Sequence, residues 1–242
     1  RELGVPFAGL FGACSTMAEG LALGAALCEG GAARNLLAMA SSHFCAAERQ
    51  FRTPLSYGAV RTPTAQWTAT AAGCCLLQPQ GEGVGIAAAT FGRVQDYQVK
   101  DINNMGAAMA PAAASTLLHY FKDTGTEPQE FDCIYTGDLG QVGSQLLREL
   151  LAAEGLLIKN HVDCGCILFD ANEQSVKSGG SGPGCCAAVL CGHILPRLRR
   201  GSQKRVLFTA TGALMSQTTF LQKETIPAVA HLVELRAPEK EK

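Results

Sequence analysis

Short apolar runs and helix-like stretches alternate along this chain, and the alternation predicts an α/β fold. An apolar run at residues 6–11 predicts a strand, and the Ala- and Leu-rich stretch at 15–29 predicts a helix. The run at 35–40 is too short for a helix and predicts a strand in the core. Further strands are expected at 66–77 (with a turn near 71–73), 85–92, 131–136, 164–169, 205–210 and 228–235, and further helices at 105–121, 141–154 and 185–199.

The pattern repeats at an offset of 170 residues. A small-residue turn, a helix, a glycine and a core strand all match at this one offset, which chance explains poorly. The repeat therefore predicts two related α/β halves around a pseudo-twofold axis. The matching segments are 12–16 with 182–186, Gly31 with Gly201, and 36–40 with 206–210.

The expected halves are residues 1–93 and 94–242, and the first half starts abruptly. The chain begins with Arg1, and residues 1–4 read as the end of a helix with its glycine cap. The second half contains a strand and a helix at 131–155, whose repeat partners would precede Arg1. We therefore expect the N-terminal half to be truncated at its start.

Composition narrows the classes of function. The net charge of −1 does not indicate nucleic-acid binding, and 47% hydrophobic residues fit a well-buried globular chain. The sequence has no apolar run of about 18 residues and no signal-peptide pattern, so we expect no transmembrane segment. The 11 cysteines are an odd number and indicate reduced thiols in a cytosolic compartment.

Cys14 is the first candidate for chemistry. It lies in a small-residue turn between the expected strand at 6–11 and the helix at 15–29. The positive end of a helix dipole favours a thiolate, and a thiolate can act as a nucleophile. The alternative is that Cys14 is a small buried hydrophobe, as many cysteines are.

Several longer motifs add to this turn. They contain the Cys14 turn itself, a segment rich in functional side chains after the second strand, and three further stretches that follow it in the chain. The motifs are Gly9-Leu-Phe-Gly-Ala-Cys-Ser-Thr-Met-Ala-Glu19, Ser41-Ser-His-Phe-Cys-Ala-Ala-Glu-Arg-Gln-Phe-Arg52, Pro63-Thr-Ala-Gln-Trp-Thr68, Asn103-Asn-Met-Gly-Ala-Ala-Met-Ala-Pro111 and Thr136-Gly-Asp-Leu-Gly140.

These motifs, with the duplicated halves and the glycine-rich segment 179–184, resemble the thiolase superfamily and, within it, the stage V sporulation protein AD family. The resemblance covers essentially the whole chain. It implies a five-layered α-β-α-β-α fold of two pseudo-repeated halves. It also implies binding of dipicolinic acid, either free or as its calcium chelate, for uptake into the developing spore. The implied partners are the other stage V sporulation A membrane proteins and a second copy in a homodimer, and the implied location is peripheral at the forespore or spore inner membrane.

Within this resemblance, the sequence argues against catalysis. Thiolase-type condensation uses a histidine and a second histidine or asparagine beside the cysteine. The histidine position carries Asp138, and the asparagine position falls near 180–182, where none is present. We therefore expect a binding protein on an enzyme scaffold. The alternative is an acyl-transferring or condensing enzyme with Cys14 as nucleophile, in which His43 could replace the lost base.

A site for dipicolinate, a flat dianion, should offer arginines, backbone N–H groups and a flat surface for the ring. The segment 43–68 supplies three arginines, Arg49, Arg52 and Arg61, and Asp138 could supply oxygen if calcium enters with the ligand. His161, Cys164 and Cys166 could suggest zinc, but no fourth ligand is evident, so no metal site and no cofactor are expected. The expected ligand-binding residues are Cys14, His43, Arg52, Gln66, Trp67, Asp138, Ser181 and Gly182.

Overall fold

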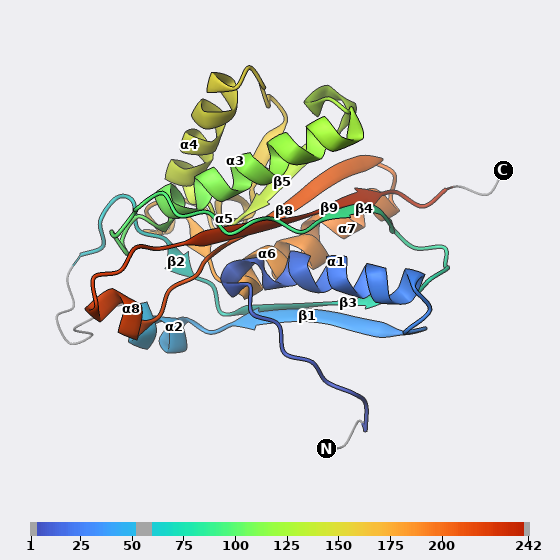
Figure 1. Ribbon diagram of the computed structural model, residues 1–242, viewed down its shortest axis with the longest axis horizontal. Coiled ribbons are helices and arrows are strands. Elements are labelled where there is room, and N and C mark those ends of the chain that lie inside the picture. Colours follow the sequence, from blue (N-terminus) through green and yellow to red (C-terminus); the bar gives the residue numbers. More distant parts are fainter. Residues whose placement is uncertain (1–3, 52–59, 240–242) are drawn as a thin grey trace.

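The computed structural model describes residues 4–51 and 60–239, with the side chains of 48–51 left out of the account. Two main sheets organise these residues (Figure 1). The larger has the strand order β4-β9-β8-β5-β6, and the smaller pairs β1 with β3. The strands are β1 Leu36–Ser42, β2 Trp67–Thr68, β3 Ala71–Leu77, β4 Gly85–Thr90, β5 Cys133–Gly137, β6 His161–Asp163, β7 Gly180–Ser181, β8 Arg205–Ala213 and β9 Ala228–Arg236.

Layers of helices and sheets alternate through the molecule (Figure 1). Their order is a helical layer, the larger sheet, a second helical layer and the smaller sheet. α3 and α4 lie over one face of the larger sheet, and α1 and α6 lie between the two sheets. The helices are α1 Thr16–Glu29, α2 Phe44–Phe51, α3 Met105–Thr124, α4 Gly140–Ala153, α5 Cys164–Leu168, α6 Pro183–Val189, α7 Leu195–Arg199 and α8 Gln217–Leu221, with a π-helical turn at Leu190–Ile194 and 3₁₀ turns at Ala13–Ser15 and Pro128–Glu130.

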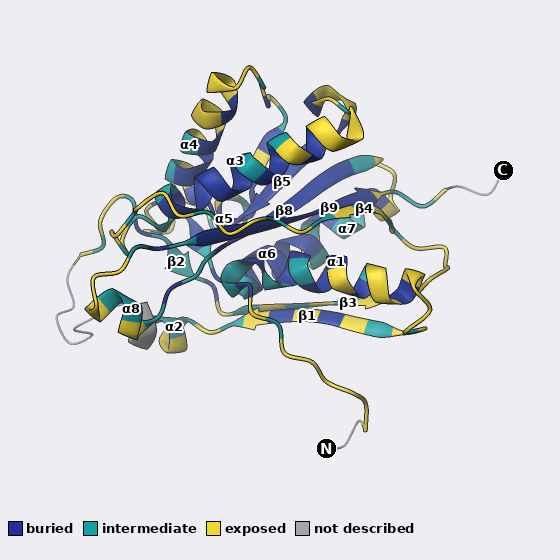
Figure 2. Cartoon of the chain, in the orientation of Figure 1, coloured by how far each residue is buried: buried dark blue, intermediate teal, exposed yellow. Residues whose placement is uncertain are grey.

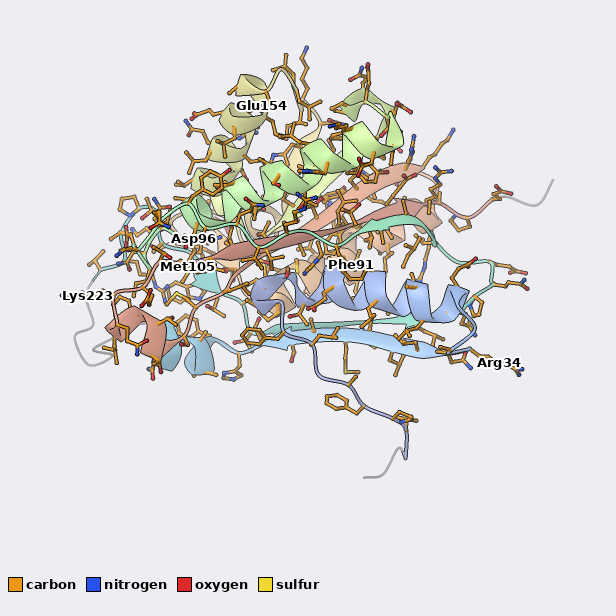
Figure 3. The ribbon with its side chains drawn as sticks, viewed as in Figure 1. Arg34, Phe91, Asp96, Met105, Glu154 and Lys223 are labelled. Carbon is orange, nitrogen blue, oxygen red and sulfur yellow. The ribbon has the colours of Figure 1, made fainter. Side chains whose placement is uncertain are left out.

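The larger sheet is mixed and forms the core. β5 runs parallel to β8 and to β6, whereas β9 runs antiparallel to β8 and β4. All five residues of β5 are buried, as in a strand covered by helices on both faces. Figure 2 shows the same burial along β8 and β9. Phe91 directly follows β4, and its ring stands edge-on to the His231 imidazole of β9 at 5.8 Å (Figure 3).

One face of α1 is buried between the two sheets. Met17, Ala18 and Leu21 are almost inaccessible to solvent. A side chain at Gly24 would lie 2.5 Å from Leu77 and 2.8 Å from Leu36, so glycine allows the helix to approach the smaller sheet. Inward and outward side chains alternate along β1, and the outward Leu37, for example, is exposed.

The repeat predicted from the sequence has a counterpart in the element order. The turn before α1 leads through that helix to β1, which pairs antiparallel with β3. The turn before α6 leads through α7 to β8, which pairs antiparallel with β9. β4, expected in the first half, lies beside β9 in the larger sheet. The boundary between 93 and 94 stays a prediction.

Two expected strands are wrong. Residues 6–11 are irregular, and Phe7 and Phe11 are exposed instead of buried in a strand. Residues 164–168 form the helix α5, because the Asp163 side chain accepts a hydrogen bond from the Gly165 N–H and caps that helix. The short apolar run at this point did not distinguish a strand from a helix.

Candidate functional site

The Cys14 turn is held rigidly at the start of α1. The Ser15 hydroxyl donates to the Gly12 carbonyl at 2.6 Å, and the Thr16 hydroxyl donates to the Ala13 carbonyl at 2.7 Å. Ala13 adopts φ +49°, an uncommon value for a residue with a side chain. These contacts fix the Cys14 side chain at the helix N-terminus, partly buried.

A second turn, between β7 and α6, faces Cys14. The Ser181 hydroxyl lies 3.9 Å from the Cys14 sulfur, and the Gly182 backbone also interacts with the thiol. Gly182 has φ +103°, and a side chain there would lie 2.7 Å from the Ser42 hydroxyl oxygen. The structure thus brings together three of the expected site residues.

Asp138 forms the inner wall of this site. It follows β5 with φ +70°, it is completely buried, and neither carboxyl oxygen has a hydrogen-bond partner. Burial raises the pKa of this carboxyl well above its ordinary value, and the nearby Asp163 raises it further, while the Cys186 and Cys185 thiols act in the opposite direction. Burial thus favours the neutral carboxylic acid form of Asp138.

The same environment suppresses the thiolate form of Cys14. Burial raises the pKa of the Cys14 thiol to about 12, with Asp138 as the second cause, although Ser181 and the Gly182 backbone favour the thiolate. Of the two alternatives for Cys14, burial favours the protonated, buried thiol over the thiolate that the helix dipole would favour, because desolvation is the largest effect on its pKa.

Gln66 connects Asp138 to β7. Its amide nitrogen donates to the Asp138 carbonyl at 2.5 Å and to the Gly180 carbonyl at 3.3 Å. Its amide oxygen is buried without a hydrogen-bond partner. Gln66 thus holds the backbone around Asp138 in place, and its role in ligand binding stays a prediction.

Trp67 belongs to an aromatic stack beside the site. Its ring packs on Phe44 with centroids 4.7 Å apart and an angle of 18° between the planes. The Arg61 guanidinium lies over the Trp67 ring at 4.2 Å and donates to the Gln66 carbonyl at 2.9 Å. Arg61 is the member of the expected arginine cluster that the described residues place next to the site.

His43, another expected site residue, does not join this group. His43 is exposed in the turn between β1 and α2, and its backbone carbonyl accepts from the Ala47 N–H. Arg52 lies outside the described residues, as does the side chain of Arg49.

The sequence did not indicate a role for Asp163, whose side chain holds the backbone that directly follows Asp138. Asp163 accepts hydrogen bonds from the Thr136 hydroxyl at 2.7 Å and from the Leu139, Gly140 and Gly165 backbone N–H groups. Burial nevertheless raises its pKa to about 6. An aspartate directly before a helix is a capping signal that could have identified it.

His161 lies behind Asp163 and is not a catalytic base for Cys14. Its Nε2 lies 2.8 Å from the Thr136 hydroxyl, which donates to Asp163, so Nε2 carries the proton. Burial lowers the pKa of His161 to about 4, with Arg148 as the second cause. Thr136 thus links a neutral imidazole to the carboxyl group that fixes the 138–140 turn.

Within residues 4–51 and 60–239, no group of three or more His, Cys, Asp or Glu side chains is arranged to hold a metal ion. Cys164 is buried and Cys166 is exposed, so these two do not share one face as the expected strand would have required. Among the helices that the structure describes, none combines the length and apolar character needed to cross a membrane.

Known proteins resemble this chain at two levels. Stage V sporulation protein AD of Bacillus subtilis (strain 168) is 44% identical over 232 residues, which cover 96% of this chain and 68% of the relative. The solved structure of the tetronic acid condensing enzyme AbyA1 has a TM-score of 0.59 at 16% identity and covers 96% of this chain and 69% of its own. The structure of 3-oxoacyl-[acyl-carrier-protein] synthase III from Aquifex aeolicus VF5 has a TM-score of 0.55 at 13% identity and covers 94% of this chain and 66% of its own.

The structural likeness confirms the expected thiolase-like α/β fold. The family model for stage V sporulation protein AD matches residues 1–236, nearly the whole chain. With the 44% identity to the Bacillus subtilis protein, this match shows that the chain belongs to the stage V sporulation protein AD family.

Proposed function

We propose that this chain is a non-catalytic thiolase-fold protein that binds dipicolinic acid, free or as the calcium chelate, for uptake into the developing spore. The observation that carries the proposal is the buried Asp138 carboxyl group beside the Cys14 thiol. A condensing enzyme needs a base or a hydrogen-bond donor of suitable pKa at this place. Burial favours the protonated forms of both Asp138 and Cys14, so Asp138 does not act as the base nor Cys14 as the nucleophile.

The histidines support the same reading. The sequence contains five, and all of them lie in the described part of the chain. His119, His161, His193 and His231 make their hydrogen bonds to Ser115, Thr136, Arg197 and Gly92. His43 is exposed. In the described residues, no hydrogen bond joins a histidine to the Cys14 thiol.

The groups around Cys14 suit a carboxylate ligand better than a reaction. The Ser181 hydroxyl and the Gly182 N–H can each donate a hydrogen bond, and a protonated Asp138 adds a third donor. A neutral carboxylic acid that donates to a carboxylate makes a short, strong hydrogen bond. Arg61, which lies over the Trp67 ring and donates to the Gln66 carbonyl, supplies a positive charge beside this group.

Calorimetric titration with dipicolinate, with and without calcium, tests the proposal. We expect saturable binding that benzene-1,3-dicarboxylate, which lacks the ring nitrogen, reproduces only weakly. Asp138→Asn keeps a neutral donor and should retain binding, whereas Asp138→Leu should abolish it. An absence of binding in both calcium conditions by the folded protein would refute the function.

The alternative function is acyl transfer by Cys14, which the condensing enzymes among the structural neighbours suggest. Incubation with acetyl-CoA and malonyl-CoA, followed by mass spectrometry of the Cys14 peptide, tests it. An acyl group on Cys14 that is absent from Cys14→Ser would favour the enzyme.

The proposed uptake role also includes the other stage V sporulation A membrane proteins as partners, a homodimer and a peripheral position at the forespore inner membrane. Sedimentation velocity measures the dimer. Co-sedimentation with vesicles that carry those membrane proteins, compared with empty vesicles, tests the partnership. Equal binding to both vesicle preparations would count against it.

A further inference from the structure

A second thiol site lies where β3 packs against the helical segment that runs from α6 to α7. At Gly73 the two backbones approach so closely that a side chain would lie 2.5 Å from the Ala187 carbonyl oxygen. Two residues further along β3 and four further along the helical segment, Cys75 and Cys191 face each other. Their sulfur atoms are 3.9 Å apart, although 116 positions separate them in the chain.

The alternation of β3 selects Cys75 rather than its neighbour for this contact. Cys75 is half-buried on the inner face of the strand, and Cys74 is exposed on the outer face. Cys191 belongs to the π-helical turn Leu190–Ile194, is half-buried, and also donates to the Cys74 carbonyl at 3.7 Å. A disulfide between them would bring the two sulfur atoms from 3.9 Å to about 2.05 Å apart.

The two thiols differ in acidity in the way a reactive pair does. The contact with Cys75 lowers the pKa of Cys191 and Arg199 also favours its thiolate, while burial opposes them. Cys75 retains its proton, because its contact with Cys191 and its burial raise its pKa. The directions of these two shifts favour Cys191 as the attacking thiolate and Cys75 as the resolving thiol.

We propose that Cys75 and Cys191 form a peroxide-sensitive pair that closes into a disulfide between β3 and the π-helical turn. The Cys191 thiolate attacks one peroxide oxygen, the O–O bond breaks, and hydroxide leaves as Cys191 becomes a sulfenic acid. The Cys75 sulfur then attacks the Cys191 sulfur, and the sulfenic acid oxygen leaves as water. Two thiols are oxidised, one hydroperoxide is reduced, and two water molecules result when the peroxide is H₂O₂.

The other cysteines near this segment do not compete equally. Burial raises the pKa of Cys14 to about 12 and that of Cys133 to about 11, and it also raises the pKa of Cys164, Cys185 and Cys186 well above the ordinary value. Their thiolate fractions at neutral pH are therefore small. The disulfide would tie the β1–β3 sheet to the same helical segment that begins at Gly182 beside Cys14.

Peptide mapping after oxidation tests the proposal on the whole chain. The protein is treated with hydrogen peroxide, alkylated, and digested with trypsin without reduction. Cleavage after Arg61, Arg93, Lys177 and Arg197 places Cys75 in peptide 62–93 and Cys191 in peptide 178–197. We expect these two peptides to be joined, with a combined mass about 2 Da below the sum of the reduced peptides.

Because both peptides contain other cysteines, matched variants identify the linked pair. Cys75→Ser and Cys191→Ser should each lose the joined peptides, whereas Cys74→Ser and Cys186→Ser should retain them. Circular dichroism under reducing conditions confirms that each variant is folded. A joined peptide that persists in Cys75→Ser or Cys191→Ser, or an oxidised wild type in which these peptides stay separate, would overturn the proposal.

Discussion

The Cys14 thiol and the Ser181 hydroxyl lie 3.9 Å apart, although 167 positions separate them in the chain. They come from the two turns that the 170-residue repeat aligns, one before α1 and one before α6. The site therefore exists only where the two turns meet. Its chemical properties depend on the relative position of the two turns as well as on the residues in each turn.

Cys14 should be a poor nucleophile in the unliganded protein. With a pKa of about 12, its thiolate fraction at pH 7.5 is roughly a thousand times lower than that of an ordinary thiol. Iodoacetamide should therefore modify Cys14 far more slowly than the exposed Cys45, as followed by peptide mass spectrometry. Equal rates at the two cysteines would contradict the neutral state assigned to Cys14.

Asp138→Asn should change how stability depends on pH. The folded protein retains the Asp138 proton, whereas the unfolded chain releases it above about pH 4, so Asp138 destabilises the fold increasingly as the pH rises. Asparagine tolerates the positive φ and cannot ionise. The free energy of unfolding of Asp138→Asn, relative to wild type, should therefore increase from pH 4 to pH 8 in urea titrations. Parallel pH profiles would show that Asp138 is ionised in the fold.

Asp163→Ala should destabilise the fold by about 3–5 kcal/mol, because buried donors at Leu139, Gly140 and Gly165 lose their acceptor. Asp163→Asn keeps one acceptor oxygen and should cost less. Urea unfolding at pH 7 measures both. A loss below about 1 kcal/mol for alanine would mean that water replaces the carboxyl group without penalty.

Glu234→Gln should weaken a buried charge network at the end of the larger sheet. Glu234 accepts from Arg205 at 2.8 Å, from Arg236 at 2.6 Å and from the Tyr120 hydroxyl. These donors outweigh burial and lower the Glu234 pKa to about 2. The stabilisation is present above pH 4.5 and is lost as the pH falls through about 2.

The expected cost of Glu234→Gln is about 3 kcal/mol at pH 7 and much less near pH 2. Glu130→Gln is the matched control, because Glu130 also pairs with Arg205 but is largely exposed, and should cost under about 1 kcal/mol. Equal effects of the two substitutions would show that burial adds nothing to the Glu234 network.

Gly73→Ala should force β3 away from the helical segment, since the new methyl group would lie 2.5 Å from the Ala187 carbonyl oxygen. We expect a loss of about 1–3 kcal/mol in thermal or urea unfolding. Gly83→Ala, with no atom within 4 Å of the added carbon, should change stability by less than about 1 kcal/mol. Gly73→Ala, but not Gly83→Ala, should also slow the oxidative linkage of Cys75 to Cys191.

The sequence predicted the elements whose signals are local. α1, β1, β5, α4, β8 and β9 lie within a few residues of their expected ranges, because each is a long periodic stretch or an apolar run between turn residues. The strand at 6–11 failed because an apolar run says nothing about whether a partner strand covers it. The strand at 164–169 failed because one capping side chain, Asp163, decides the local conformation.

The site was predictable in its members and not in its electrostatics. The family motifs identified Cys14, Asp138, Ser181 and Gly182, which the fold brings together. The protonation states depend on burial and on Asp163, a residue 25 positions after Asp138, and neither is visible in a local pattern. Desolvation is a property of the packed molecule, so the helix-dipole argument for a thiolate could not anticipate it.

The pairing of β4 with β9 has a consequence for how the molecule comes apart. A protease that cuts after the exposed Arg93 would sever the chain between the two expected halves, yet β4 would remain hydrogen-bonded in the sheet of the second. The two fragments should therefore stay associated after cleavage and separate only in denaturant. Unfolding of the intact chain should accordingly be a single cooperative transition.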